Sequence, residues 1–413
     1  MNFKKACAFT LAISLPTYAN AYDYSVGDVE MSLHGFGSFG WTQTDNSDVG
    51  FVTSGILSPY SGVDSSGTFD SDTGFGLQGR VAYDRFSITA QVVSRGEQHY
   101  DPKFEWLYGA IELYDGLTVR GGRLRLPVYM LSESLEVGYS YNWVRPPIEV
   151  YNQVPITNYD GGDITYSNSI FDWDYSLQMF YGQRNIDEKN HLKLRDILGL
   201  NGTIGNEYVT LRAGYANTGM TVSIGDPRMS GLLSQLRSTG FDYAADELDA
   251  NDENGDFYEV GFSLDYEDFL LSGEYTWLRV PGFRANSEAW YISTGYRIGN
   301  FTPSFTFSSF RNTDNKHLDN AIASVAGTPF HAGLQGLLPS QSRKQESITL
   351  GLRYDIDTSS LTTASIPMMA IKAEWQYINP KGTMGLFDTT RSGADNFTGS
   401  GVSVFSVALD FVF

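Results

Sequence analysis

The sequence predicts an all-β protein, a transmembrane antiparallel β-barrel of about sixteen strands. Three observations predict it. Stretches of about ten residues alternate large apolar side chains with small or polar ones, as strands with a lipid face and a lumen face do. No apolar run reaches the ~18 residues that a membrane-spanning helix needs. The 413 residues include 26 Tyr, 26 Phe and 43 Gly, a composition that favours aromatic strands joined by tight turns.

The chain opens with a predicted secretory signal peptide, residues 1–21. Lys4 and Lys5 form a short basic region, an apolar run follows over about residues 6–15, and residues 19–21 read Ala-Asn-Ala, an A-x-A cleavage site. An ordinary buried first helix is the alternative, and it does not require this order of basic, apolar and small residues. We therefore expect an exported barrel made of residues 22–413.

The exported part is acidic and free of cysteine. Cys7, the only cysteine, lies within the predicted signal, so disulfides and cysteine metal sites are not expected. The signal contains two lysines and none of the 48 Asp and Glu residues, so its removal makes the net charge of -20 more negative. Nucleic acid is therefore not an expected partner, because phosphate binding needs clustered cations.

The last residues form an amphipathic strand that ends in Phe413. One face carries large apolar side chains and the other smaller or polar ones, namely Phe405, Val407, Leu409, Phe411 and Phe413 against Val404, Ser406, Ala408, Asp410 and Val412. This ending resembles the terminal strand of Gram-negative outer-membrane barrels, where it is the assembly signal. The resemblance implies an outer-membrane location, with membrane lipid, lipopolysaccharide and the barrel assembly machinery as partners. The alternative is the last strand of a secreted sandwich.

Sixteen strands are predicted from the period-two pattern. They span about 29–41, 75–84, 86–96, 104–114, 117–127, 160–169, 171–183, 191–204, 207–218, 255–267, 269–281, 288–299, 301–312, 344–357, 366–379 and 402–413. The sixth and eighth have the weakest alternation.

The connections alternate in length. Those after even-numbered strands are mostly tight turns, such as Asp84-Arg85, Asp115-Gly116 and Glu267-Asp268. Five others are long, at about 42–74, 128–159, 219–254, 313–343 and 380–401. Bacterial outer-membrane barrels combine short periplasmic turns with long extracellular loops and an even strand number. A soluble sandwich has no reason to alternate loop length in this way.

Charged residues fall on the predicted inner face of several strands. In "MMAIKAEWQYI", Lys372 and Glu374 point inward while apolar side chains of the same strand face lipid. By the same alternation, Arg212 and Arg353 face the lumen from other strands. Charges inside a barrel require water, so we expect a channel rather than a packed core.

Two short motifs suggest other chemistry. Gly35, Gly37 and Gly40 have the G-x-G-x-x-G spacing of a dinucleotide site, but they lie within a strand pattern that no helix follows. The acidic segment 249–256, "DANDENGD", suggests calcium, but its glycine is out of the EF-hand register and no glutamate closes the loop. We expect a solvated acidic loop, with weak divalent bridging to lipopolysaccharide left open.

The sequence predicts no enzyme, cofactor or metal site. The five histidines are scattered, and neither a nucleophile elbow nor an H-E-x-x-H motif is present. A catalytic pair assembled across strands is not excluded by spacing alone.

Arginines gather on the predicted inner face around the fifth strand. Arg123 and Arg125 share one face of "GGRLRLP", while Leu124 and Leu126 would face lipid. Arg80 and Arg95 face inward from the second and third strands. Because these strands lie close together, the four arginines are predicted to form a basic strip on the pore wall.

The segments "GRLRLPVYM" and "WVRPPIEVYNQVP" resemble porin-like outer-membrane proteins of gamma-proteobacteria, within the Gram-negative porin superfamily. The pattern resemblance covers nearly the whole exported chain. It implies a sixteen-stranded homotrimer whose third loop, residues 128–159, folds into the lumen and narrows the pore. A Gly-Arg strand ending in proline is also similar to the phosphate-porin group, but that group's tandem lysines are absent here, so phosphate selectivity does not follow.

The loop carries charges that can face the basic strip. Glu133, Glu136 and Glu149 are predicted to lie opposite the arginines, together with Arg145. Opposite charges across a constriction create a transverse field that favours polar solutes. The alternative is that the arginines only pair with neighbouring acids and hold the wall together.

The function predicted is passive diffusion of small hydrophilic solutes and ions across the outer membrane. An eighteen-stranded substrate-specific channel and a plugged barrel acting as an adhesin or surface receptor remain alternatives. The arginine strip favours anionic solutes and the acidic net charge favours cations, so ion selectivity is left open.

Overall fold

The computed structural model describes residues 23–53, 62–154, 156–187, 191–223, 227–249, 253–282, 284–357, 368–381, 385–388 and 400–413. The predicted signal peptide lies outside these ranges, as do residues 250–252 of the acidic segment.

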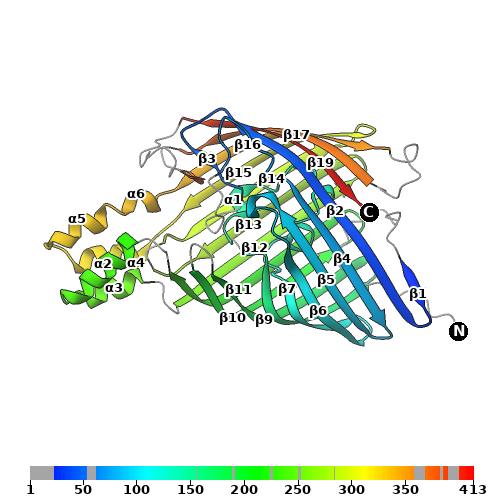
Figure 1. Cartoon of the computed structure of the whole chain (residues 1–413), viewed down its shortest axis with the longest axis horizontal. Coiled ribbons are helices and arrows are strands. Elements are labelled where there is room, and N and C mark those ends of the chain that lie inside the picture. Colours follow the sequence, from blue (N-terminus) through cyan, green and yellow to red (C-terminus); the bar gives the residue numbers. More distant parts are fainter. Residues whose placement is uncertain are drawn as a thin grey trace.

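Sixteen antiparallel strands close into one barrel (Figure 1). They are β2 (Val29–Thr44), β4 (Gly74–Tyr83), β5 (Phe86–Arg95), β6 (Lys103–Tyr114), β7 (Leu117–Arg125), β8 (Asn158–Ile170), β9 (Trp173–Asp187), β10 (His191–Gly205), β11 (Val209–Ser223), β12 (Glu253–Tyr266), β13 (Phe269–Arg279), β14 (Ser287–Tyr296), β15 (Phe301–Asn312), β16 (Lys344–Ile356), β17 (Met368–Asn379) and β19 (Val402–Val412). Each pairs with its neighbour in sequence, and β19 pairs with β2. The predicted strand number is confirmed, including the two strands with the weakest pattern.

The seam between the two ends of the chain explains the glycine motif. Phe413 and Gly35 exchange two backbone hydrogen bonds of 2.8 Å, and the ring of Phe413 occupies the place where a side chain at position 35 would lie. The rings of Phe411 and Phe75 cover Gly37 in the same way. These glycines therefore serve close packing within β2.

The turns at one end of the barrel are mostly tight, as predicted. Asp84, Gly116, Phe171, Glu267 and Gly299 have positive φ angles between 52° and 78°, which short strand connections require. The connection after β16, residues 357–367, is longer than the others. At the opposite end, two short strands, β3 (Gly50–Phe51) and β18 (Phe387–Asp388), pair the first long loop with the last. Another short strand, β1 (Tyr24–Val26), pairs with the start of β2.

Two of the long loops contain helices that extend beyond the barrel wall (Figure 1). One holds α2 (Pro227–Ser238) and α3 (Asp242–Leu248), and the other α4 (Lys316–Ser324), α5 (Pro329–Gln335) and α6 (Leu338–Gln341). They share an apolar core of their own, formed by Leu236, Ala244, Ala245, Leu248, Leu318, Ala321, Val325 and Leu334. The sequence analysis predicted loops here and did not predict these helices. None of the helices in the described ranges is long and apolar enough to cross a membrane.

The predicted strand faces agree with the exposure of most side chains. On β19, Phe405 and Val407 are exposed on the outer wall, while Ser406 and Asp410 are buried inside. On β17, Trp375 and Tyr377 face outward, while Lys372 and Glu374 are buried within the barrel. The result is an apolar belt around a polar interior, as an outer-membrane barrel requires.

Candidate functional site

The connection between β7 and β8, residues 126–157, lies inside the barrel, and we call it the lumen loop. It contains η3 (Ser132–Ser134), η4 (Gly138–Ser140) and α1 (Ile148–Tyr151). Its side chains and backbone contact inward-facing residues of strands far away in sequence. Trp143 donates from its indole N–H to Thr306 on β15 at 2.8 Å, and Tyr151 donates to Glu274 on β13 at 2.7 Å. These contacts place the loop across the lumen.

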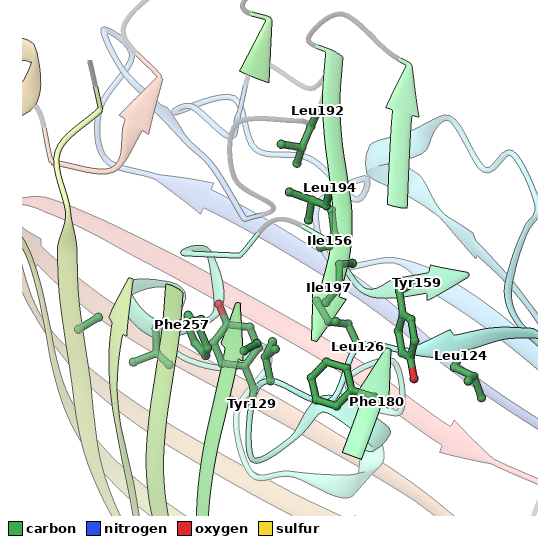
Figure 2. Packing of buried hydrophobic residues seen from close by; sticks show 14 of the residues in the cluster. Leu124, Leu126, Tyr129, Ile156, Tyr159, Phe180, Leu192, Leu194, Ile197 and Phe257 are labelled. Atoms are coloured by element: carbon green, nitrogen blue, oxygen red, sulfur yellow. The ribbon is translucent and has the colours of Figure 1, made fainter. Parts of the chain in front are cut away.

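One side of the lumen loop is apolar and packs against inward-facing aromatic rings. Figure 2 shows Tyr129 beside Phe257 of β12, and the two rings meet edge to face at 5.3 Å. Trp143 meets Tyr291 of β14 in the same way at 5.6 Å. Such pairs add about 0.5–1.5 kcal/mol beyond the burial of their area. The sequence analysis did not predict this contact. Phe257, Tyr291 and Phe310, large rings on the otherwise polar face of their strands, were the available signal.

Lys372 binds the backbone of the lumen loop. Its ammonium donates to the carbonyl oxygens of Gly138 at 2.6 Å and Trp143 at 2.8 Å, and lies 2.8 Å from Asp410. Ser38 donates to the other oxygen of Asp410. The prediction that Lys372 lies inside the barrel is correct, but its side chain is fully buried and holds the loop instead of facing open water.

Arg353 also supports the lumen loop. It donates to the carbonyl oxygens of Tyr139 at 2.8 Å and Tyr141 at 3.1 Å, and pairs with Asp355 at 2.7 Å. Its guanidinium lies 4.5 Å from the centroid of the Tyr139 ring, a cation–π contact. Arg353 thus faces the lumen as predicted, and the loop covers it.

The prediction that Glu149 faces the arginine strip is wrong. Glu149 lies on α1 against the opposite wall, where it is completely buried. It accepts hydrogen bonds from Ser308 at 2.8 Å, from Gln345 at 2.6 Å and from Ser347. Neutral donors on β15 and β16 satisfy this carboxylate, so the helix packs there. The error arose because sequence position within a loop does not fix which wall a side chain meets.

Arg145 joins the lumen loop to the first long loop. It pairs with Asp72 through two hydrogen bonds of 2.7 and 2.8 Å and also donates to Thr42 and Ser406. Burial raises the pKa of Asp72, but attraction to Arg145 and its hydrogen bonds outweigh burial and lower that pKa below 3.8. Arg145 is thus a structural cation in a buried pair.

Four charged residues connect β5, β6 and β7 to the lumen loop. Arg95 lies 2.7 Å from both Glu105 and Glu136. Arg125 lies 3.0 Å from Glu136 and 3.4 Å from Glu105, and it donates to the carbonyl oxygen of Ser132 at 2.6 Å. Burial raises the pKa of Glu136, but attraction to Arg95 and Arg125 outweighs it and holds that pKa below its usual value. The sequence analysis placed Arg95 and Arg125 opposite a group of acids that included Glu136, but it did not identify Glu105.

The prediction that Arg123 lines the lumen is wrong. Arg123 pairs in register with Leu107, which is 48% exposed on the outer wall, and its guanidinium binds Asp160 at 2.7 Å. Leu124 and Leu126, predicted to face lipid, are buried in the apolar core around the lumen loop.

The lumen-facing arginine at this point of β7 is Arg120, which the sequence analysis missed. It pairs with Asp163 of β8 at 2.7 Å and lies 3.8 Å from Glu133 of the lumen loop. Arg120 and Arg123 are three positions apart and so lie on opposite faces of the strand. Arg125 has the parity of Arg123, but it lies beyond the last pair between β6 and β7, and its guanidinium reaches Glu105 and Glu136.

The remaining predicted lumen residues lie on the inner face. Arg212 lies 3.2 Å from Glu259 and donates to the carbonyl oxygen of Pro127 at 2.5 Å. Glu374 is buried in register with Ser406, which accepts from Arg145. Arg80 lines a cavity and is treated below.

Two cavities lie on either side of one short part of the lumen loop. The outer cavity, of about 230 Å³, is lined by Ser132 and Glu136 together with Arg95 and Asp72. The inner cavity, of about 510 Å³, is lined by Glu133 together with residues of β2 and β4–β11. Residues 132–136 therefore separate a space on the long-loop side from a larger one on the turn side.

The described part of the acidic segment makes contacts within the protein. Asp249 pairs with Arg237 of α2 at 2.8 Å, and Asp256, within β12, accepts from Tyr215 at 2.7 Å. In the described ranges, no group of three His, Cys, Asp or Glu side chains is arranged to hold a metal ion.

Comparisons with known proteins agree with the barrel. The family model described as Gram-negative porin matches residues 6–366. No curated protein matches the chain. Similar solved structures include Salmonella typhi OmpF in complex with daunomycin, with a TM-score of 0.55 at 12% identity over 95% of this chain and 100% of that one. An anion-selective porin from Comamonas acidovorans has a TM-score of 0.52 at 12% identity over 93% and 100% of the two chains.

In-vitro folded OmpT, an outer-membrane protein of Vibrio cholerae, is similar to the same degree. Its TM-score is 0.52 at 10% identity, covering 95% of this chain and 100% of that one. At such identities the three structures support the fold alone, whereas the family model covers most of the sequence. The chain belongs to the Gram-negative porin family, and its place is the outer membrane of a Gram-negative bacterium.

Proposed function

We propose that this porin forms a water-filled channel for passive diffusion of small hydrophilic solutes and ions, and that the lumen loop sets its narrowest section. The observation that carries the proposal is the pair of cavities separated by residues 132–136. Charged side chains line both, with Arg95 and Glu136 on the outer side and Arg120 and Glu133 on the inner side. Opposite charges at a constriction favour polar over apolar solutes.

The test is conductance of the purified full-length protein in planar bilayers. We expect stepwise currents in potassium chloride, and swelling of loaded liposomes by small sugars but not by large ones. A folded protein that gives neither current steps nor swelling contradicts the proposal. Heat-modifiable gel mobility supplies the control for folding.

A plugged barrel serving as a surface receptor is a second candidate, and one observation favours it. The lumen loop bonds to inner-face residues around most of the barrel, including Thr42 on β2, Arg95 on β5, Arg212 on β11, Arg353 on β16 and Lys372 on β17. In this case the helices of the long loops would form the binding face. Folded protein without conductance would select this candidate.

Three further parts of the proposal concern export and assembly. Residues 1–21 are removed after Ala21, Phe413 is the signal read by the barrel assembly machinery, and the mature protein is a homotrimer embedded among lipopolysaccharide. Intact mass of the membrane-extracted protein tests the cleavage. A trimer band in unboiled gel samples tests the oligomer, and a Phe413→Ser variant that still reaches the membrane at normal levels would contradict the role of the last residue.

A further inference from the structure

Arg80, in the inner cavity, is a cation without a partner among the residues that the structure describes. Its side chain is exposed and lines the cavity, and within the described ranges it makes no hydrogen bond, ion pair or ring contact. The other arginines that face the lumen nearby are satisfied, Arg120 by Asp163 and Arg212 by Glu259. An unpaired guanidinium facing water inside a pore is free to bind a passing anion.

Two aromatic rings lie beside this cation. Trp106 and Tyr108 of β6 both line the inner cavity, with ring centroids 6.4 Å apart. Thr89 pairs with Arg80 on one side and with Tyr108 on the other, so the Cα atoms of Arg80 and Tyr108 lie about 10 Å apart, two strand spacings. The indole N–H of Trp106 is buried and has no partner in the part of the chain that the structure describes.

Positive and negative side chains both line the cavity, and their positions differ relative to the rings. The guanidinium of Arg120 lies 5.5 Å from the centroid of the Tyr108 ring. Of the acids that line the cavity, Glu133 lies 3.8 Å from Arg120, and Asp84, Glu112 and Asp115 lie at the turn end of the barrel. In the described ranges, the unpaired cation of Arg80 therefore lies close to the rings, whereas the carboxylates lie beside Arg120 or at the turn end.

We propose that the inner cavity is a binding site for small aromatic carboxylates. The carboxylate binds the guanidinium of Arg80, and the ring stacks on Trp106 and Tyr108. Charge-assisted pairing and stacking act on opposite ends of such a solute, so both are needed for full affinity. This inference rests on the proposed function, because it names the class of solute that the channel would admit. Binding at the site can be tested without measuring a current.

The direct test is calorimetry of the full-length protein in detergent with sodium benzoate. Sodium acetate, which lacks the ring, and benzamide, which lacks the charge, are the two comparison ligands. We expect benzoate to bind at least about tenfold more tightly than either, since benzamide lacks the hydrogen bond between charged groups and acetate lacks the stacked ring. Arg80→Gln should lower benzoate affinity about tenfold, and Trp106→Leu should lower it without changing acetate binding.

Arg123→Gln is the matched control, because it removes the same charge from the outer wall and should leave benzoate affinity unchanged. Equal affinity of Arg80→Gln and the unmodified protein would overturn the site, as would equal binding of benzoate and acetate. Within the described residues Arg80 makes no hydrogen bond or ion pair that the variant would remove, so the variant tests binding alone.

Bilayer recording separates the site from the channel. Benzoate added on the turn side, where the inner cavity lies, should reduce the current more than benzoate on the loop side. Benzoate binding without any current would support the binding site and contradict the proposed channel. Current without benzoate binding would support the proposed channel and contradict the binding site.

Discussion

The lumen loop meets two parts of the barrel wall in different ways. Against β13–β17, which we call the seat, it packs aromatic rings, buries Glu149 among neutral donors and gives its carbonyl groups to Lys372 and Arg353. Against β2 and β4–β7, which we call the charged wall, it forms ion pairs at Arg95, Arg120 and Arg125. Both cavities are lined by the charged wall and the loop, the inner one also by strands up to β11.

This difference separates two tasks. Apolar packing and buried hydrogen bonds leave no room for water, so the seat fixes the loop in position. Under the proposed function, ion pairs beside the two cavities leave charge available to solutes, so we expect the charged wall to set selectivity. Substitutions at the seat should change the stability and position of the loop, and substitutions at the charged wall should change which ions pass.

The largest effect is expected for Lys372→Met at the seat. The variant leaves Asp410 buried without its cation and frees two loop carbonyls, and removing one partner of a buried pair costs about 3–5 kcal/mol. Native-state hydrogen exchange of the lumen-loop amides measures this loss. Lys316→Met, at an 82% exposed side chain on α4, is the control and should change nothing. Normal exchange protection of the lumen-loop amides in Lys372→Met would contradict the distinction between the seat and the charged wall.

Trp143→Leu should have a smaller effect of the same kind. It removes the hydrogen bond to Thr306 and the edge-to-face contact with Tyr291, a loss of about 2 kcal/mol. The same exchange measurement applies, with larger current noise as a second readout. Trp290→Leu on the outer wall is the matched control, and equal loss of loop protection in both variants would contradict the account.

Acid should weaken the link between Arg145 and Asp72. The pKa of Asp72 is lowered in the folded protein, so its attraction to Arg145 is complete above pH 3.8 and is lost as pH falls through the lower folded value. The pKa of Glu136 is also lowered in the folded protein, so its attraction to Arg95 and Arg125 is likewise lost as the pH falls. Single-channel noise should therefore rise below about pH 4. Asp72→Asn should show raised noise at pH 7 already; quiet currents in that variant would show that the link does not hold the loop.

The smallest structural change with a clear readout is at the charged wall. Arg95→Gln should shift the reversal potential in a salt gradient toward cations, because it leaves Glu105 and Glu136 with one cation fewer. Arg123→Gln, on the outer wall, should not shift it. Equal shifts of the reversal potential in the two variants would contradict the account and indicate that Arg123 lines the pore.

The barrel could be predicted from the sequence because each strand carries its own evidence. Alternation of side chains and tight turns such as Asp84-Arg85 are local, and all sixteen strands formed where the pattern placed them. In regular strands such as β17 and β19, the alternation of residues along the strand gave the correct inner and outer faces.

The lumen loop could not be predicted in the same way. Glu149 and Arg145 are fixed by partners more than seventy residues away, and nothing local in sequence specifies them. At Arg123, the assignment failed because Leu124 and Leu126 were taken to face lipid, whereas they lie in the apolar core around the lumen loop. Counting from Arg120, in the regular part of the strand, would have given the correct face.

Cysteine accessibility tests most directly the claim that current passes along the charged wall while the seat stays closed. In a Cys7→Ser background, which removes the only cysteine, Glu133→Cys places a thiol beside the inner cavity and Gln153→Cys places one at the seat, where Gln153 bonds to Ser287. A cationic thiol reagent should reduce the single-channel current stepwise in Glu133→Cys and leave Gln153→Cys unchanged. Block at Gln153→Cys with none at Glu133→Cys would contradict the account.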